Sequence, residues 1–321
     1  MSQQLAVGID IGGTNTKFGI VDRRGNILCD GRMLTNKHED VNAFLDELHG
    51  HLSLLITQVG GMENIRGIGV GAPNGNFYTG NIEYAPNLRW KGVIELAKLL
   101  EAKFGVPAIL TNDANAAALG EFMYGAARSM RDFIVITLGT GVGSGIVANG
   151  QLIYGHDGFA GELGHCIVIP GGRLHTGTGA RGSLEAYASA TGVTNTALEF
   201  LASRPDTKSI LRDLKKEDIN SKTIYEAAMK GDPLAMEVYE FTGKILGEAL
   251  ANFVMFSSPE AIVLFGGLTK AGDLIMKPVR EHMEKNLLPI FQNKVKLVFS
   301  ELQESDAAIL GASALAWEMK D

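Results

Sequence analysis

The chain has 321 residues, a formal net charge of −7 and 20% charged residues. This length exceeds the size at which a single hydrophobic core stops growing, so we expect two lobes. No Lys- or Arg-rich arm is present, which argues against nucleic acid or an anionic membrane as a partner. Cys29 and Cys166 are too few for a disulfide framework, and neither a signal-peptide core nor an apolar run of membrane-spanning length is found. These features predict a cytoplasmic protein.

A β-hairpin is predicted at the start of the chain. Residues 5–9 form a short apolar strand that ends in Asp10, and alternation resumes over 17–21 after a turn rich in glycine and threonine. A carboxylate beside exposed N–H groups and a hydroxyl can hold phosphate and position Mg²⁺, directly or through water. Because Asp-x-Gly-Gly is also a common turn, a purely structural role is the alternative interpretation.

Helical and strand patterns alternate after this hairpin. The spacing of apolar residues predicts a helix over 41–59, strands over 65–70 and 108–110, a helix over 90–104, and an alanine-rich helix from Asn112. Asp113 fits either a helix cap or a carboxylate that accepts the proton of a sugar hydroxyl attacking a γ-phosphate. We expect the lobes to divide near this point, into 1–118 joined by a C-terminal helix at 305–321, and 119–304.

A second glycine-rich hairpin follows an apolar run at 133–138. Glycines stand at every second position from Gly139 to Gly145, which leaves one face of the backbone open to an anionic ligand. A tight hairpin whose glycines serve only turn geometry is the alternative. The arm at 144–153 resembles the segment 18–28, so the chain is predicted to use one unit twice, in two lobes of related topology that face a shared cleft.

The remainder of the chain is mainly helical. Helices are predicted over 183–190, 194–202, 224–230 and 233–256, strands over 262–265 and 295–298, and a final apolar helix over 307–319 that packs on the first lobe. Gly266 and Gly267 add a third glycine-bearing strand end, a set that suits a nucleotide. Glu162, His165 and Glu185 offer the acceptors and donors that a neutral polyol requires.

Seven motifs together resemble the sugar kinases of the repressor, open reading frame, kinase (ROK) family, within the actin-like ATPase superfamily. They are DIGGTNTK at 10–17, GVGAPNG at 69–75, PNLRW at 86–90, TNDANAAALGE at 111–121, the glycine-rich segment 138–165, GSLEAYAS at 182–189 and FGG at 265–267. The resemblance covers nearly the whole chain. It implies an α/β, two-lobed actin-like ATPase (ribonuclease H-like) fold and an ATP-dependent hexose kinase of glucokinase type, with Mg²⁺.

The resemblance also implies roles for individual residues. Asp113 would be the catalytic base. The residues implied to bind sugar hydroxyls are Asn87, Asn112, Glu162, His165 and Glu185. The residues implied to surround the phosphates of Mg·ATP are Asp10, Gly12, Gly13, Thr14, Lys17, Gly139, Thr140 and Gly141, with Asp10 holding Mg²⁺ through water. Gly266 and Gly267 would lie beside the adenosine.

One departure from the family pattern concerns zinc. Many members bind a structural zinc ion through the histidine that matches His165 and three cysteines in a C-x-C-G-x-x-G-C pattern. The three corresponding positions here carry hydroxyls, Thr176, Thr178 and Ser183. Neutral hydroxyls are poor zinc ligands, so no zinc is expected, the alternative being an unusual site of His165, Cys166 and His175.

Two other functions are alternatives to a glucose kinase. Sugar-sensing repressors of the family carry a helix-turn-helix segment before the first phosphate loop, and only four residues precede Leu5 here, so no DNA-reading element is expected. A kinase for N-acetylglucosamine, N-acetylmannosamine, allose or fructose would use the same machinery, and pocket volume is not readable from one sequence. The family resemblance further implies a homodimer or homotetramer acting in carbohydrate metabolism such as glycolysis.

Overall fold

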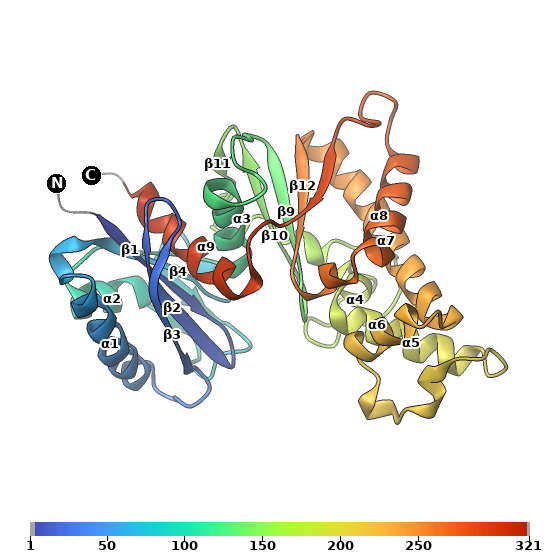
Figure 1. Ribbon diagram of the computed structural model, residues 1–321, viewed down its shortest axis with the longest axis horizontal. Helices are drawn as coiled ribbons and strands as arrows, with labels where there is room; N and C mark the ends of the chain where they lie inside the picture. Colours follow the sequence, from blue (N-terminus) through green and yellow to red (C-terminus); the bar gives the residue numbers. More distant parts are fainter. Residues whose placement is uncertain (1–3, 320–321) are drawn as a thin grey trace. The chain divides into compact units, whose positions relative to one another are not determined.

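The computed structural model describes residues 4–319, which form two compact α/β units (Figure 1). Unit 1 comprises the described residues up to Arg131, Gly145–Gly161 and the described residues from Ser300. Unit 2 comprises Asp132–Ser144 and Glu162–Phe299. Among the described helices, none combines the length and the apolar character that crossing a bilayer requires.

Unit 1 is built on a five-stranded sheet with the strand order β3-β2-β1-β4-β8. Its strands are β1 (Leu5–Ile11), β2 (Asn15–Asp22), β3 (Ile27–Leu34), β4 (Ile65–Gly71) and β8 (Ala108–Thr111). Its helices are α1 (Val41–Gln58), α2 (Leu96–Phe104), α3 (Asp113–Tyr124) and α9 (Glu304–Glu318). A small sheet adds β5 (Gly75–Asn76), β6 (Asn81–Glu83) and β7 (Val93–Ile94). β1 is antiparallel to β2 and parallel to β4, which is parallel to β8.

The two faces of this sheet are covered in different ways. The odd-numbered residues of β1 pack into one hydrophobic core with α1 and α2. On the other face, a Cβ atom at Gly8 would overlap the carbonyl oxygen of Ile309, and one at Gly69 would overlap that of Ala312. The missing side chains therefore let the backbone of α9 lie directly on β1 and β4, with α9 also against α3 (Figure 1). The predicted packing of the last helix on the first lobe is confirmed.

Unit 2 combines a sheet with a group of five helices. The sheet has the order β11-β10-β9-β12-β13, formed by β9 (Phe133–Leu138), β10 (Val142–Ala148), β11 (Gln151–Leu152), β12 (Ala261–Phe265) and β13 (Lys296–Phe299). β10 begins in unit 2 and runs into unit 1, which also contains β11. The helices are α4 (Glu185–Ala188), α5 (Ala190–Ser203), α6 (Ser221–Met229), α7 (Pro233–Ser257) and α8 (Asp273–Asn286). Short 3₁₀ turns of unit 2 occupy Leu163–His165, Ile210–Asp213, Lys216–Asp218 and Gly267–Ala271, and one of unit 1 occupies Met62–Asn64.

The two five-stranded sheets have the same connectivity. In the first, an antiparallel hairpin partner flanks β1, and β4 and β8 follow in parallel on its other side. In the second, β12 and β13 follow β9 in parallel, and the hairpin of β10 and β11 lies on the other side of β9. This repetition confirms the prediction, made from the similarity of two short segments, that the chain uses one unit twice.

Two elements differ from the sequence prediction. The helix expected over 90–104 begins only at Leu96, because Gly92 has a φ of +81° and Ile94 pairs with Ile82 in the small sheet. Helix α8 was not predicted, and Pro278 within it removes a backbone donor that a helix normally uses. The structure accommodates Pro278 against Gly243 of α7, where a Cβ atom would come within 2.5 Å of the proline ring.

Candidate active site

The first glycine turn lies between β1 and β2 and contacts the segment that carries Asn87. The N–H of Gly12 donates to the carbonyl oxygen of Asn15 at 2.9 Å, which closes the turn. A Cβ atom at Gly13 would lie 2.8 Å from the carbonyl oxygen of Asn87 and 3.2 Å from its Cβ. Only glycine permits this approach. The structure therefore places a residue predicted to bind sugar directly beside a residue predicted to bind phosphate.

The start of α3 distinguishes the roles of two neighbouring residues. Asn112 is the N-cap, and its Oδ1 accepts the N–H of Asn115 at 2.7 Å. Asp113 is the first residue of the helix, and its Oδ1 accepts the N–H of Ala114 at 2.9 Å. The alternative that Asp113 is simply the helix cap is therefore wrong, because Asn112 fills that position.

Asp10 and Asp113 come close to each other at the carboxyl ends of parallel strands. A Cβ atom built on Gly71, the last residue of β4, would lie 3.8 Å from Oδ1 of Asp10 and 3.6 Å from Cα of Asp113. Lys17 on β2 pairs with Asp10 across the hairpin. The sheet edge thus gathers two carboxyl groups and one ammonium group, as expected where parallel strands end.

Burial makes both carboxyl groups harder to ionise than free aspartate. Burial, and then the negative charge of Asp113, raise the pKa of Asp10 to about 7, against the lowering effect of Lys17. Burial also raises the pKa of Asp113, against the N–H groups of Ala114 and of Asp113 itself. The side chain of Asp113 keeps an exposed face even though the protein around it desolvates the carboxyl group. Two desolvated acids in one place favour a bound cation or a shared proton.

The second glycine loop, between β9 and β10, is fixed to the start of α5. The N–H of Gly139 donates to the carbonyl oxygen of Gly141 at 3.0 Å, and its own carbonyl accepts the N–H of Ala190 at 2.9 Å. The hydroxyl of Thr191 donates to the carbonyl oxygen of Thr140 at 3.2 Å. A Cβ atom at Gly139 would meet nothing within 4 Å, so packing does not require a glycine there. The open space suits a ligand that approaches the backbone.

The third glycine pair follows β12 and lies against the end of β9. Gly266 has a φ of +107° and a ψ of 179°, a conformation that is essentially restricted to glycine. A Cβ atom there would also lie 2.7 Å from the carbonyl oxygen of Leu138. Gly267 resembles Gly139 in that a Cβ atom would meet nothing within 4 Å. Unit 2 therefore brings its two predicted nucleotide loops together.

The three predicted sugar ligands of unit 2 differ in their exposure and in the contacts they make. Glu162 and His165 are exposed, with 3.7 Å between Oε2 and Nε2. Glu185 is already engaged, because its Oε2 accepts the N–H of Val142 at 2.7 Å and its Oε1 lies 2.7 Å from Nε2 of His175. No spacing pattern indicates the contact between Glu185 and His175, because the loop that separates the two residues has no periodicity.

The residues at the family's zinc position do not fit that metal. The hydroxyl of Thr178 is hydrogen-bonded to Nδ1 of His175 at 2.9 Å, and the hydroxyl of Ser183 is fully buried without a hydrogen-bond partner. Within residues 4–319, no group of three or more histidine, cysteine or acidic side chains is arranged to hold a metal ion. A site built from His165, Cys166 and His175 is therefore not formed in this structure.

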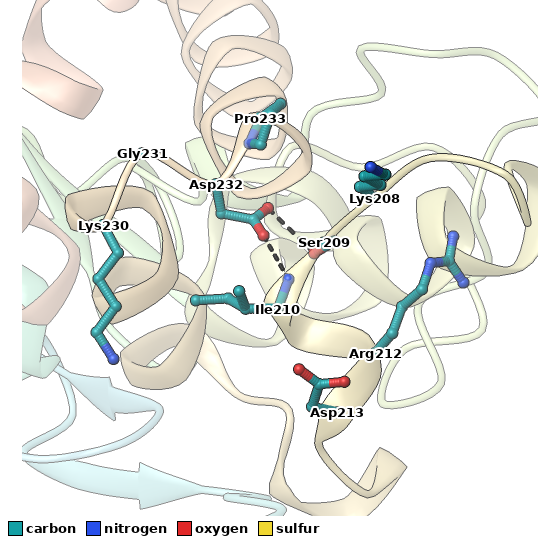
Figure 2. Close-up of a pocket in the computed structure, with 9 residues that line it drawn as sticks. All are labelled: Lys208, Ser209, Ile210, Arg212, Asp213, Lys230, Gly231, Asp232 and Pro233. Atoms are coloured by element: carbon teal, nitrogen blue, oxygen red, sulfur yellow. Dashed lines mark hydrogen bonds between the residues drawn. The ribbon is translucent and has the colours of Figure 1, made fainter.

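A pocket in unit 2 lies apart from these residues (Figure 2). Its lining comes from the turn before α7 and from the segment around Ile210, and includes none of the predicted site residues. The buried carboxylate of Asp232 accepts the N–H groups of Ile210 at 2.6 Å and Ala235 at 2.9 Å, and the hydroxyl of Ser209 at 3.1 Å. Asp232 therefore caps α7 and holds the neighbouring segment in place.

Two groups of predicted residues result, one in each unit. Those in unit 1 are Asp10, Gly12, Gly13, Thr14, Lys17, Asn87, Asn112 and Asp113. Those in unit 2 are Gly139, Thr140, Gly141, Glu162, His165, Glu185, Gly266 and Gly267. Each group combines candidate phosphate-binding residues with candidate sugar-binding residues. The structure adds His175, which sequence reasoning considered only as a metal ligand.

Known proteins similar to this chain include sugar kinases. The model of the ROK family matches residues 6–319. A glucokinase from Halalkalibacterium halodurans is 35% identical over 330 residues, which span 100% of this chain and 97% of that protein. A glucokinase from Streptomyces coelicolor is 34% identical over 98% of each chain. The crystal structure of a ROK family glucokinase from Streptomyces griseus in complex with glucose and AMPPNP is 31% identical, with a TM-score of 0.81 over 98% of this chain and 100% of that chain. The predicted two-lobed actin-like ATPase fold is confirmed.

Proposed function

The chain belongs to the ROK family, and on that premise we propose that it is an ATP-dependent hexose kinase that transfers the γ-phosphoryl group to the 6-hydroxyl of glucose. The observation that carries the proposal is the pair of desolvated carboxyl groups, Asp10 and Asp113, at one edge of the sheet beside a glycine turn. Such a pair can supply a general base and a cation-binding group in one place. Similarity to glucokinases over 97–98% of their length supports glucose as the acceptor.

Asp113 is the proposed catalytic base. Its raised pKa brings the carboxylate closer to the basicity at which a general base works at neutral pH. Its place in the first turn of α3 favours the ionised form, because the helix N-terminus carries partial positive charge. Asp113 would remove the proton from the attacking hydroxyl while the N–H of Ala114 holds its carboxylate in place.

Residues of each unit are proposed to bind the sugar. In unit 1 these are Asn87 and Asn112, and the amide nitrogen of Asn112 is the group for a sugar hydroxyl because its Oδ1 caps α3. In unit 2 they are Glu162, His165 and Glu185. The carboxylates would accept hydrogen bonds from hydroxyls, and the imidazole can donate or accept one.

The nucleotide is proposed to bind at the three glycine loops. Gly12, Gly13, Thr14 and Lys17 would contact phosphates from unit 1, and Gly139, Thr140, Gly141, Gly266 and Gly267 would contact phosphates and adenosine from unit 2. The open space at Gly139 and Gly267 supports this assignment. Asp10 would hold Mg²⁺ through water, which fits a metal that uses one or two carboxylates together with substrate phosphates. When bound, Mg²⁺ would balance charge on the transferred phosphoryl group.

The remaining predictions concern the whole protein. We infer a homodimer or homotetramer without bound nucleic acid, in the cytoplasm where ATP and sugars meet. A structural zinc is not part of the proposal. Sedimentation velocity of the purified protein measures the oligomeric state directly.

The first test is ADP release from Mg·ATP in a coupled assay, with glucose, N-acetylglucosamine, N-acetylmannosamine, fructose, mannose and allose side by side. The proposal predicts the highest kcat/KM for glucose. Preference for another of these sugars would change the acceptor and keep the kinase, whereas inactivity on all of them would overturn the proposed function.

The second test replaces the proposed base. Asp113→Asn should lower kcat by about 10²- to 10⁴-fold and leave the affinity for sugar nearly unchanged, because a general base acts on the transition state. Asp206→Asn, a change at an exposed carboxylate in unit 2, is the matched control and should keep full activity. Near-normal turnover of the Asp113 variant would show that the base is another residue.

A further inference from the structure

We propose that His175 is a positioning residue that holds Glu185 against the backbone of the second glycine loop, so that the loop at 166–184 is braced without a metal ion. The proposal rests on the proposed function for its kinetic consequences. Its structural part concerns contacts within unit 2 alone and is testable without activity.

Glu185 joins two segments through its two carboxylate oxygens. Oε2 accepts the N–H of Val142 at 2.7 Å, directly after the loop of Gly139, Thr140 and Gly141. A Cβ atom at Gly141 would overlap Oε2 of Glu185, so a glycine is required for this approach. Oε1 lies 2.7 Å from Nε2 of His175. The carboxylate therefore lies between the backbone of the glycine loop and the imidazole.

The hydrogen bonds around His175 specify one tautomer. An ionised Glu185 can only accept hydrogen bonds, so Nε2 of His175, 2.7 Å from its Oε1, carries a proton and donates. In the neutral imidazole Nδ1 is then an acceptor, and the hydroxyl of Thr178 donates to it at 2.9 Å while accepting the N–H of Ala180 at 3.3 Å. Thr178 thus orients the imidazole, and the imidazole orients the carboxylate.

Arg173 anchors the loop that delivers His175. Its guanidinium donates to the carbonyl oxygens of Ala186 at 2.5 Å and Gly192 at 3.1 Å, and forms two hydrogen bonds with Glu199 at 2.8 and 2.6 Å. The same group lies 4.5 Å above the ring of Tyr187. These contacts hold the loop against α4 and α5, so they fix the position from which His175 contacts Glu185.

The arrangement couples a proposed sugar ligand to a proposed phosphate loop. An ionised carboxylate has about four lone-pair positions, so Glu185 can accept sugar hydroxyls while it keeps both contacts. Displacing Glu185 would release the N–H of Val142 and change both the sugar site and the glycine loop. Loss of His175 should therefore weaken the binding of both substrates.

Variants of His175 test this proposal through two readouts. The amide nitrogen of Gln reaches about as far as Nε2 of histidine, whereas that of Asn reaches about as far as Nδ1, so His175→Gln can still donate to Glu185 and His175→Asn cannot. His175→Asn should raise KM for glucose and for ATP about tenfold, since hydrogen bonds to charged groups contribute strongly. His175→Gln should recover most of that loss. Hydrogen–deuterium exchange of the peptide that contains Val142 should accelerate in the Asn variant and stay near the wild-type rate in the Gln variant.

The outcomes separate the proposal from the proposed function. An inactive wild-type protein would refute the kinase, and the exchange experiment would still decide the role of His175. Unchanged exchange and KM in His175→Asn would show that Glu185 needs no partner, and equal losses in both variants would indicate general packing; either result overturns the proposal. If His175→Asn fails to fold, Thr178→Val provides the test, because it leaves His175 and Glu185 in place and should still accelerate exchange at Val142. Unchanged exchange in Thr178→Val would then overturn the proposal.

Discussion

Replacing Asp10 by Asn should remove much of the pH dependence of stability between about pH 4 and pH 7 in the ligand-free protein. Burial and the charge of Asp113 raise the pKa of Asp10 from 3.8 to about 7 in the folded state. The folded protein thus binds this proton more tightly than the unfolded chain does. The stabilisation that this proton provides is complete below the pKa of the unfolded chain, 3.8, and it is lost as the pH rises through the pKa of the folded state, about 7. Asn resembles the protonated acid and cannot lose a proton in this range.

The size of the effect follows from the two pKa values. A rise from 3.8 to about 7 is close to three units, and each unit corresponds to about 1.4 kcal/mol. The free energy of unfolding of Asp10→Asn should therefore exceed that of the wild type by about 3 kcal/mol more at pH 7 than at pH 4, because both pKa values lie close to the ends of this interval. Because Asp10 and Asp113 interact, the titration belongs to the pair and spreads over the interval.

The assay is urea unfolding of both proteins in steps from about pH 4 to about pH 7.5, followed by circular dichroism. The quantity to follow is the difference in the free energy of unfolding between the two proteins at each pH. Effects of acid on other groups are common to both proteins and cancel in this difference. Asp206→Asn, at an exposed position, should show no growing difference from the wild type. A constant difference between Asp10→Asn and the wild type at every pH would refute the reasoning, since Asp10 would then ionise as easily in the folded as in the unfolded state.

Two further predictions concern packing and metal. Gly69→Ala should destabilise the protein by about 3 kcal/mol or more, measured by urea unfolding, because the new methyl group would overlap the backbone of Ala312 and neither backbone can yield. Gly50→Ala within α1 meets nothing within 4 Å and should instead stabilise by up to about 1 kcal/mol; a similar loss in both variants would contradict the account of α9. A zinc chelator that spares Mg²⁺ should leave ADP release and the melting temperature unchanged, and a loss of either would reveal a metal site that Thr176, Thr178 and Ser183 do not explain.

The strands and their glycine-bearing ends were predictable because their signal is local. Buried strands such as β9 and β12 are short apolar runs that end in glycine, and each run is readable without knowledge of its neighbours. The repeated connectivity was predictable for a similar reason, since related hairpins have related turns. The position of Asp113 also followed from local pattern, although only the structure shows that Asn112 supplies the cap.

The contacts that orient the site were not predictable, because they join residues without a periodic relation. Glu185, His175 and Val142 meet through a loop, and no residue spacing encodes that meeting. Nothing in the sequence distinguishes Arg173 from the arginines and lysines that are expected to be exposed. In the structure its side chain is only 10% exposed and holds the loop in place. Likewise, β7 forms because Ile94 pairs with Ile82 of β6. The helical spacing of the apolar residues alone favours a helix that includes Ile94.

The position of α9 has a consequence for the order in which the protein forms during synthesis. Helix α9 leaves the ribosome after all the other described helices and strands, yet it covers the glycine-bearing face of β1 and β4, which leave it well before α9 does. Unit 2 ends at Phe299, so its whole chain is available before α9 is made. Nascent chains should therefore complete unit 2 first, and unit 1 should close only when α9 arrives. A ribosome that stalls before residue 304 would leave β1 and β4 with one bare face, open to association with other chains.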